Sequence, residues 1–515
     1  MTNDTKTAVG TPTGASSSVK MGVFTLAMIN VSAIVSLRGL PAESTYGLSS
    51  AFYYIFAAIF FLIPVSLVAA ELTTGWPQKG GVFRWVGEAF GTRFGFLAIW
   101  LQWIESTIWF PTVLTFAAVS IAFIGPHKSW DAALSANSIY VLCLVLVVYW
   151  LATMLNLRGM RTSGAITKWG TLLGTVLPAA VLVAMGLVYW ATGNHIDINM
   201  DARRFFPDLT NFDNIVLAAS IFLFYAGMEM SAVHVKDVHN PGRNYPMAIG
   251  IASVLTVLIF VFGTLAIGFI IPKNEINLVQ SLLVAYDRLF AHFGVQWLGS
   301  VIAVCLAFGV LAQVVAWVGG PSKGLLEVGR AGYLPVFMQH TNRNGVQKSI
   351  LIIQGIIVTL LSIFFVVLPS VQTAYQIITQ LTIILYLIMY MLMFAAAIYL
   401  RHKEPHTPRS FRVPGGRTLG MWIVAGVGML GCLLAFFFSF IPPAQIPVGS
   451  PAVYVGILVA GTVIFAGIPF IIYACRKPGW IDARSKAEFE PFGWESANRP
   501  ESAVSATQNS PRTPL

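Results

Sequence analysis

The sequence predicts an all-α integral membrane protein with about twelve transmembrane helices. Its 515 residues are 56% hydrophobic and only 10% charged, and the mean hydropathy is +0.74. Apolar runs of about 20 residues, the length that crosses a bilayer as a helix, recur along the whole chain. Together these observations exclude a soluble domain of this length.

The expected spans follow one another from residue 22 to residue 475. They cover residues 22–47, 48–71, 94–124, 138–156, 166–190, 213–235, 246–271, 296–320, 349–368, 371–400, 418–441 and 451–475. We expect an interfacial turn in the third span, because it is too long for one straight crossing. Residues 1–20 are polar without a cleavable signal pattern, which predicts a retained N-terminal tail. Residues 476–515 are polar and rich in Pro, Ser and Ala, which is typical of a solvated C-terminal tail.

The net charge of +10 indicates membrane topology and not a nucleic-acid partner. If the N terminus lies inside, most lysines and arginines between spans fall in cytoplasmic loops, as the positive-inside rule requires. These loops cover residues 73–93, 157–165, 236–245, 323–348 and 401–417, whereas the outside loops hold only Lys128, Arg203, Arg204, Lys273 and Arg288. The sequence therefore predicts that both termini are cytoplasmic.

The sequence contains no pattern of an enzyme. Its four cysteines, Cys143, Cys305, Cys432 and Cys475, lie in apolar spans and are expected to be small buried hydrophobic residues. The chain has no nucleotide-binding glycine loop on a soluble domain, no zinc spacing and no nucleophile constellation. We therefore expect neither catalysis nor primary pumping, and no metal or cofactor.

A few ionisable residues lie inside the expected spans, where a charge costs several kcal/mol, so each is a candidate functional residue. They are Arg38, Glu43, Glu71, Glu105 and Glu229, and Lys168 at the start of span five joins them. The alternative interpretation is structural: Arg38 pairs with one of the acids Glu43, Glu105 or Glu229 and holds the bundle together.

Two spans carry residues that interrupt helices. Span one contains Gly39 and Pro41, which should unwind it near its middle. Span six, five spans later, reads "FLFYAGMEMSAVHV", with Gly227 and the charge of Glu229 at its centre. This spacing predicts two five-helix repeats of inverted topology, whose broken ends present N–H groups and carbonyls to a zwitterionic amino acid. The expected transport core covers residues 21–400, and two accessory spans follow within residues 401–475.

Four stretches of the sequence resemble a known transporter family. They are "PQKGGVFRWVGEAFG" after span two, "YAGMEMSAVHVKDVHNPGRNYP" across span six, "GVLAQVVAWVGGPSKGLLEVGRAGYLP" closing span eight, and "FRVPGG" before span eleven. Over about residues 20–475 the chain resembles the amino acid–polyamine–organocation superfamily, and within it the glutamate/γ-aminobutyrate antiporter family. The resemblance implies a secondary transporter that exchanges glutamate for γ-aminobutyrate by alternating access in a bacterial inner membrane. It also implies a functional link to a cytosolic amino acid decarboxylase and a role in acid resistance.

The resemblance also implies which residues line the substrate site. The break in span one would hold the α-carboxylate and amino groups, with an acid in span six, a tryptophan gate in span eight and two tyrosines in span ten. The implied site residues are Ser36, Leu37, Arg38, Gly39, Tyr225, Gly227, Glu229, Gln313, Trp317, Tyr386 and Tyr390.

Two of these residues depart from the pattern of the glutamate exchangers. Gln313 stands where they carry an acid one turn before the tryptophan, and Arg38 stands where they carry a tyrosine. Both changes favour an anionic ligand group, because a planar guanidinium can pair with a side-chain carboxylate of the substrate. Arg38 and Lys168 are also candidates for replacing a coupling sodium ion, so we expect no sodium requirement.

Several alternatives stay open. The fold also suits an antiporter or proton-coupled permease for another amino acid or amine, and a non-transporting amino acid sensor. A channel fits less well, because the spans show isolated charges and no continuous polar lining.

Some members of the family fold the C-terminal tail into the cytoplasmic mouth as a plug. Phe489, Phe492 and Trp494 would anchor such a plug here, and a solvated tail is the alternative.

Overall fold

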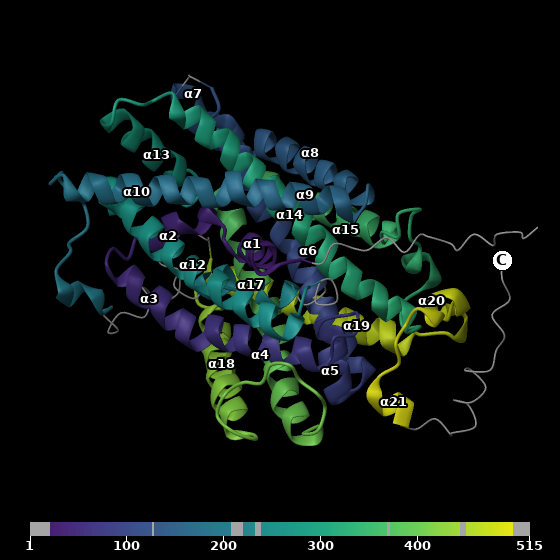
Figure 1. Ribbon diagram of the computed structural model, residues 1–515. Coiled ribbons are helices and arrows are strands. Elements are labelled where there is room, and N and C mark those ends of the chain that lie inside the picture. The colour runs from purple at the N-terminus through teal and green to yellow at the C-terminus, as the bar shows by residue number, and fades with distance from the viewer. Residues whose placement is uncertain are drawn as a thin grey trace, which may run out of the picture.

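The computed structural model describes residues 21–125, 128–207, 220–231, 238–367, 371–442 and 450–497. Within these ranges the regular structure is helical, with one isolated bridge between Met21 and Val238. The α-helices are α1 (Val23–Ile34), α2 (Leu40–Ser44), α3 (Ser49–Ala57), α4 (Ile63–Gly75), α5 (Val82–Phe90), α6 (Thr92–Ala122), α7 (Lys128–Ser135), α8 (Ser138–Leu157), α9 (Met160–Thr171), α10 (Leu177–Ala191), α11 (Ser220–Phe224), α12 (Pro241–Ile270), α13 (Ser281–His292), α14 (Leu298–Arg330), α15 (Lys348–Ser362), α16 (Phe364–Val367), α17 (Val371–Lys403), α18 (Leu419–Phe438), α19 (Pro451–Ala474), α20 (Ala483–Ala487) and α21 (Gly493–Ala497). Figure 1 shows them gathered into one bundle, with α7 and α13 at one end and α5, α20 and α21 at the other.

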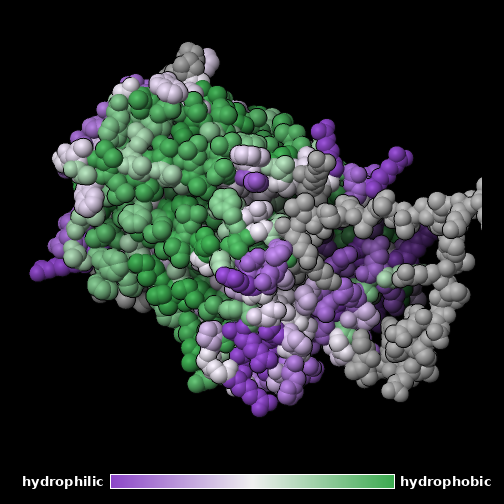
Figure 2. All heavy atoms as spheres, viewed as in Figure 1, coloured by the Kyte–Doolittle hydropathy of each residue, from purple (hydrophilic) through white to green (hydrophobic). Residues whose placement is uncertain are grey.

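Ten helical stretches of the described residues are long and apolar enough to cross a membrane. The expected ninth span is the shorter apolar helix α15, followed by α16. The expected sixth span contains α11, and its residues 213–219 and 232–235 lie outside the described part. The predicted integral membrane fold with about twelve spans is thus confirmed. Figure 2 shows an apolar face over much of the bundle, with hydrophilic residues toward the end that carries α5 and α20.

The expected interfacial turn in the third span is wrong, because α6 is one uninterrupted helix of 31 residues. Pro111 lies inside α6 and does not end it. Almost all residues of α6 are buried, since the helix packs against α5, α8, α14 and α17. A helix enclosed by protein does not have to match the thickness of the bilayer, so its length needs no turn.

Span one is broken near its middle, as predicted, but Pro41 is not the residue that ends the first half. The helix α1 ends at Ile34, and Val35 and Ser36 are extended before a 3₁₀ turn, Leu37–Gly39, leads into α2. Pro41 lies in the first turn of α2, where its missing N–H is not needed by the helix. The proline therefore starts the second half-helix, and the break lies about five residues before it.

Span six is interrupted where the sequence predicted. The helix α11 ends at Phe224, and a 3₁₀ turn follows at Met228–Ser231. Between them Gly227 has a φ of +119°, a conformation that a residue with a side chain rarely adopts. A Cβ atom at Gly227 would also lie 3.0 Å from the Trp317 ring. Both the backbone conformation and the close approach therefore require glycine at this break.

The basic loops of the sequence meet at one end of the bundle. Direct contacts join the loop at 157–165 to the loop at 323–348. Similar contacts join the loop at 401–417 to the loops at 73–93 and 236–245. Asn342 donates to the Leu157 carbonyl at 2.7 Å, Thr74 donates to the Phe411 carbonyl at 3.3 Å, and Gly242 lies against Ser410. This shared end is the end of α5 and α20 in Figure 1. The arrangement agrees with the predicted loop pattern, and which side of the membrane this end faces stays a prediction.

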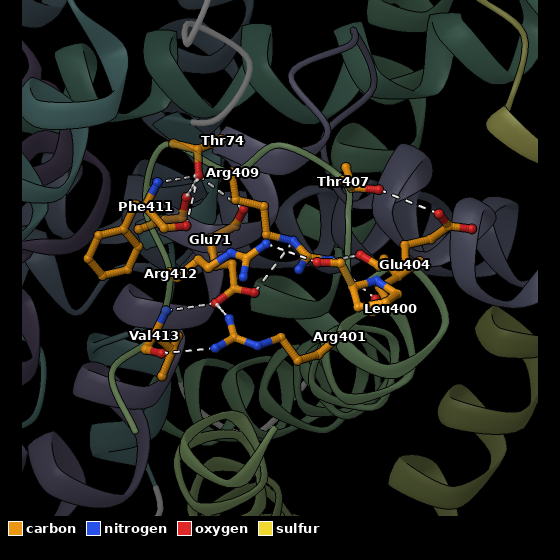
Figure 3. A network of polar contacts seen from close by, with 12 residues as sticks. Glu71, Thr74, Leu400, Arg401, Glu404, Thr407, Arg409, Phe411, Arg412 and Val413 are labelled. Atoms are coloured by element: carbon orange, nitrogen blue, oxygen red, sulfur yellow. Dashed lines mark hydrogen bonds and ion pairs between the residues drawn. The ribbon is translucent and has the colours of Figure 1, made fainter. Parts of the chain in front are cut away.

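Glu71, one of the candidate residues inside the spans, fixes a loop (Figure 3). Its carboxylate accepts from Arg401 Nη1 at 2.5 Å and from the Val413 backbone N–H at 2.7 Å. Arg401 in turn donates to the carbonyls of Arg417 and Gly416 at 2.6 and 2.9 Å. The pair therefore holds the "FRVPGG" loop against the ends of α4 and α17, which is a structural role.

The expectation of a solvated C-terminal tail is wrong for residues 476–497, which dock on α5 and the end of α14. Phe492 is fully buried, and its ring lies 4.6 Å from the Arg84 guanidinium. Glu88 accepts from the Gly493 backbone N–H at 3.0 Å, and Arg330 pairs with Glu488. Aromatic and charged side chains, spaced irregularly in the sequence, supply the docking surface. Residues 498–515 lie outside the described part.

Candidate functional site

The break in span one places Arg38 inside the bundle, where its side chain is only 3% exposed. Its Nη1 donates to the Tyr375 hydroxyl at 2.8 Å and to Thr112 Oγ1 at 3.2 Å. The guanidinium also lies 5.4 Å from the Trp109 ring centre and 5.8 Å from that of Phe224. Neutral hydroxyls and aromatic faces thus hold this cation.

No ion pair joins Arg38 to any carboxylate among the described residues. Its Nε is buried and has no hydrogen-bond partner there. The structural interpretation, in which Arg38 pairs with Glu43, Glu105 or Glu229, is therefore not supported. The buried guanidinium retains an N–H group that an anionic ligand can use.

Glu229 differs from Arg38, because both of its carboxylate oxygens accept hydrogen bonds from the protein. Oε1 accepts from the Tyr386 hydroxyl and from Gln102 Nε2, the latter at 2.8 Å. Oε2 accepts from the Tyr390 hydroxyl at 2.6 Å, and that hydroxyl accepts from the Gly227 N–H at 2.8 Å. The acid and the tyrosine pair therefore fix the break of span six to α17 and α6.

Trp317 on α14 closes the space between the two breaks. Its Nε1 donates to the Ala33 carbonyl at 2.9 Å, one of the carbonyls left free where α1 ends. Its ring centre lies 5.5 Å from Trp109 and 6.1 Å from Tyr386. Trp317 and Ala33 line both a small pocket of about 20 Å³ and a larger cavity of about 490 Å³. The tryptophan thus separates these two spaces.

The small pocket brings together five of the predicted site residues, namely Ser36, Arg38, Gln313, Trp317 and Tyr386. Glu229 and Tyr390 lie directly behind this lining, through their hydrogen bonds to Tyr386 and to each other. The other predicted residues do not line the pocket. Leu37 is buried, Gly39 and Gly227 allow close backbone approaches, and Tyr225 donates to the Tyr54 carbonyl at 3.2 Å, on α3.

Comparison with known proteins now gives the family. The family described as "Amino acid permease" matches residues 21–465 of the chain. The chain belongs to the amino acid permease family. This family is part of the amino acid–polyamine–organocation superfamily, so the resemblance found in the sequence is confirmed.

The relatives of this permease are transporters. An uncharacterised transporter of Legionella pneumophila is 40% identical over 88% of this chain and 96% of its own length. A glutamate/γ-aminobutyrate antiporter of Lactococcus lactis is 32% identical over 88% of this chain and 90% of its own length. A probable agmatine/putrescine antiporter of the same species is 23% identical over 82% of this chain and 88% of its own length.

Glu105 is a pocket residue of this permease that the sequence identified only as an acid inside a span. It is 2% exposed, lines the small pocket, and has an Oε1 without a hydrogen-bond partner among the described residues. A signal was available, because Gln102, Glu105, Trp109 and Thr112 follow at helical spacing on α6. That polar and aromatic stripe identifies the face of α6 that meets the site. Tyr375, the other unforeseen contact of Arg38, carries no comparable signal.

Lys168 of this permease lies outside the small pocket. Its side chain is exposed on α9 and lines the larger cavity, together with Met28 of α1 and Gln347. Its Nζ lies 5.5 Å from the Trp169 ring centre. The expected role of Lys168 in replacing sodium stays a prediction.

Proposed function

We propose that this permease exchanges glutamate for γ-aminobutyrate across a bacterial inner membrane. The observation that carries the proposal is Arg38, a buried guanidinium that lines the pocket at the break and has no carboxylate partner among the described residues. A buried unpaired charge is costly, so an anionic group of the ligand would stabilise it. A cationic amine without a carboxylate would be repelled.

Arg38 suits both members of the proposed substrate pair. Decarboxylation of glutamate removes the α-carboxylate and keeps the side-chain carboxylate and the amino group. The carboxylate that pairs with Arg38 is therefore common to glutamate and γ-aminobutyrate. The α-carboxylate of glutamate would use the N–H groups that begin the 3₁₀ turn at Leu37–Gly39. The named activity of the Lactococcus relative supports the same pair.

Transport requires the pocket to open. A space of about 20 Å³ holds about one water molecule and not an amino acid. The adjoining cavity of about 490 Å³ reaches Met21 and Gln347 at the end of the bundle with the basic loops. Displacement of Trp317 from Ala33 would join the two spaces and admit the ligand from that end. Closure there and opening at the other end would complete alternating access.

The physiological role follows from the exchange. Uptake of glutamate and export of γ-aminobutyrate, coupled to a cytosolic decarboxylase, would consume internal protons and contribute to acid resistance. In this proposal the end with the basic loops and both termini faces the cytoplasm.

A competition experiment in liposomes tests the ligand class. Purified permease should take up labelled glutamate, and unlabelled glutamate and γ-aminobutyrate should compete at pH 5 or pH 7. Lysine, arginine and putrescine should compete poorly, because Arg38 repels the cationic side chains of the two amino acids and the ammonium groups of putrescine. Dominant competition by any of these cations would overturn the proposed substrate pair and favour an amine exchanger.

A further inference from the structure

The acids inside the bundle differ in whether their oxygens are satisfied. Glu229 has three donors on its two oxygens, and Glu71 has Arg401 and a backbone N–H. Glu105 is the acid that lines the small pocket within the described part of the chain, and its Oε1 accepts no hydrogen bond there. It is also only 2% exposed, so a ligand that enters the pocket can supply the donor that the protein does not provide.

The same pocket contains an unpartnered group of opposite charge. Arg38 Nε is buried without an acceptor among the described residues, and yet no ion pair connects Arg38 with Glu105. Trp109, one turn after Glu105 on α6, lies under the Arg38 guanidinium and occupies the space beside it. Arg38 and Glu105 thus line the same pocket without contacting each other. A ligand between them can supply an acceptor for Arg38 and a donor for Glu105.

We propose that Glu105 binds the ammonium group of the substrate while Arg38 binds the carboxylate. The proposal rests on the proposed function and names the chemistry of the same site: a ligand with an ammonium and a carboxylate at its two ends, such as an ω-amino acid. An ammonium that donates to Glu105 satisfies the buried oxygen and neutralises the carboxylate. Glu229, held by Tyr386, Tyr390 and Gln102, positions the break and does not contact the ligand.

Two ligand pairs that differ only by the ammonium test this role. Glutamate is compared with glutarate, and γ-aminobutyrate with butyrate, by equilibrium binding to the purified full-length permease. In the wild type the amino ligand of each pair should bind at least about tenfold more tightly. In Glu105→Gln that ratio should fall by about tenfold or more, because the amide keeps the shape and loses the charge. Binding of glutarate should change little.

A shorter acid gives a second readout that does not depend on removing the charge. Glu105→Asp moves the carboxylate back by one methylene. The preference should therefore shift from γ-aminobutyrate toward the longer 5-aminovalerate. Glu275→Gln is the matched control, because Glu275 is exposed, pairs with Arg288 at 2.7 Å and lies outside the pocket. Its ligand ratios should equal those of the wild type.

The outcomes separate this inference from the proposed function. Wild-type permease that binds neither glutamate nor γ-aminobutyrate would overturn the proposed function and the ligand on which the inference rests. Wild-type permease that prefers the amino ligands, with unchanged ratios in Glu105→Gln and reduced ratios in Glu229→Gln, would assign the ammonium to Glu229 and overturn the inference alone. Unchanged chain-length preference in Glu105→Asp would also contradict it.

Discussion

Arg38 and Glu229 show how single residues keep a charge inside this bundle in two different ways. Glu229 has its full set of donors from Tyr386, Tyr390 and Gln102, so it fixes the backbone where span six breaks. Arg38 has hydroxyls and aromatic rings as neighbours and retains an unused N–H. A satisfied charge stabilises the structure, whereas an unsatisfied one is available to a ligand.

This difference predicts the effect of substitutions at Arg38. Arg38→Ala should lower glutamate uptake in liposomes by at least about a hundredfold, and the variant should still fold and insert. Arg38→Lys should recover only part of the activity, because an ammonium lacks the planar fork of the guanidinium. Size-exclusion profiles and thermal unfolding serve as the folding control. Full uptake by the alanine variant would show that the charge is peripheral, and loss of the folded protein would support a structural role.

Tyr390 has a structural role, and its substitution is expected to lower the stability of the permease. Its hydroxyl donates to Glu229 and accepts from the Gly227 N–H, so Tyr390→Phe leaves two buried polar groups without this partner. The free energy of unfolding in detergent should fall by about 1–3 kcal/mol. Tyr399→Phe is the control on the same helix, because Tyr399 is 41% exposed. Equal stability of the two variants would contradict the described hydrogen bonds.

At the scale of elements, ion pairs and aromatic contacts attach the loops to the helix ends. Glu71 and Arg401 are 2% and 3% exposed, and replacing Glu71 leaves Arg401 buried without its counter-charge. Glu71→Gln should therefore destabilise the permease by about 3–5 kcal/mol. The double variant Glu71→Gln/Arg401→Met should lose less free energy of unfolding than the two single variants lose together. Strict additivity in thermal unfolding would show that the two side chains do not act as a pair.

The docked C-terminal segment predicts a dependence on pH. Burial raises the pKa of Glu88, and the Gly493 N–H and the Arg84 guanidinium oppose that rise only in part. The exposed Glu404 adds a further small rise in this pKa by repulsion between like charges. Because the docked state raises this pKa, docking is favoured fully below the ordinary pKa of a glutamate and weakens as the pH rises through the raised value.

A spin label on Ser485→Cys, in a variant whose four native cysteines are replaced, measures this docking directly, because Cys143 and Cys475 are exposed and would also be labelled. Its mobility should be lower at pH 5 than at pH 7.5, since acidification keeps the segment docked. The pH dependence should disappear in Glu88→Gln, which cannot titrate. Higher mobility at pH 5 would reverse the predicted sign.

At the scale of the whole molecule, the sequence predicted the membrane fold and both breaks, because composition and helix-breaking residues are local signals. It also singled out Arg38 and Glu229 as charges inside spans and Trp317 through the resemblance, and the structure places all three at or next to the small pocket. It assigned Pro41 the wrong role, because a proline can begin a half-helix as well as end one. It did not foresee Tyr375 beside Arg38 or Phe492 beside Arg84, since these contacts join residues 337 and about 400 positions apart in the chain.

The whole-molecule topology has its own test. The described residues of all five basic loops lie at one end of the bundle, and the positive-inside rule assigns that end to the cytoplasm. Single cysteines at His340 and Ser410, both exposed at this end, should resist a membrane-impermeant reagent in intact cells and react after permeabilisation. A single cysteine at the exposed Lys273 should react in intact cells. External labelling at position 340 or 410 would reverse the topology.

Exchange itself is tested most directly by comparing loaded and empty liposomes that contain the purified permease. If the empty carrier reorients slowly, external labelled glutamate should enter vesicles loaded with γ-aminobutyrate or glutamate, and should enter empty vesicles poorly. The expected result is uptake into loaded vesicles at least about tenfold faster than into empty ones, and no such difference with Arg38→Ala. Equal uptake into loaded and empty vesicles, or tight glutamate binding with no flux under any gradient, would contradict the account.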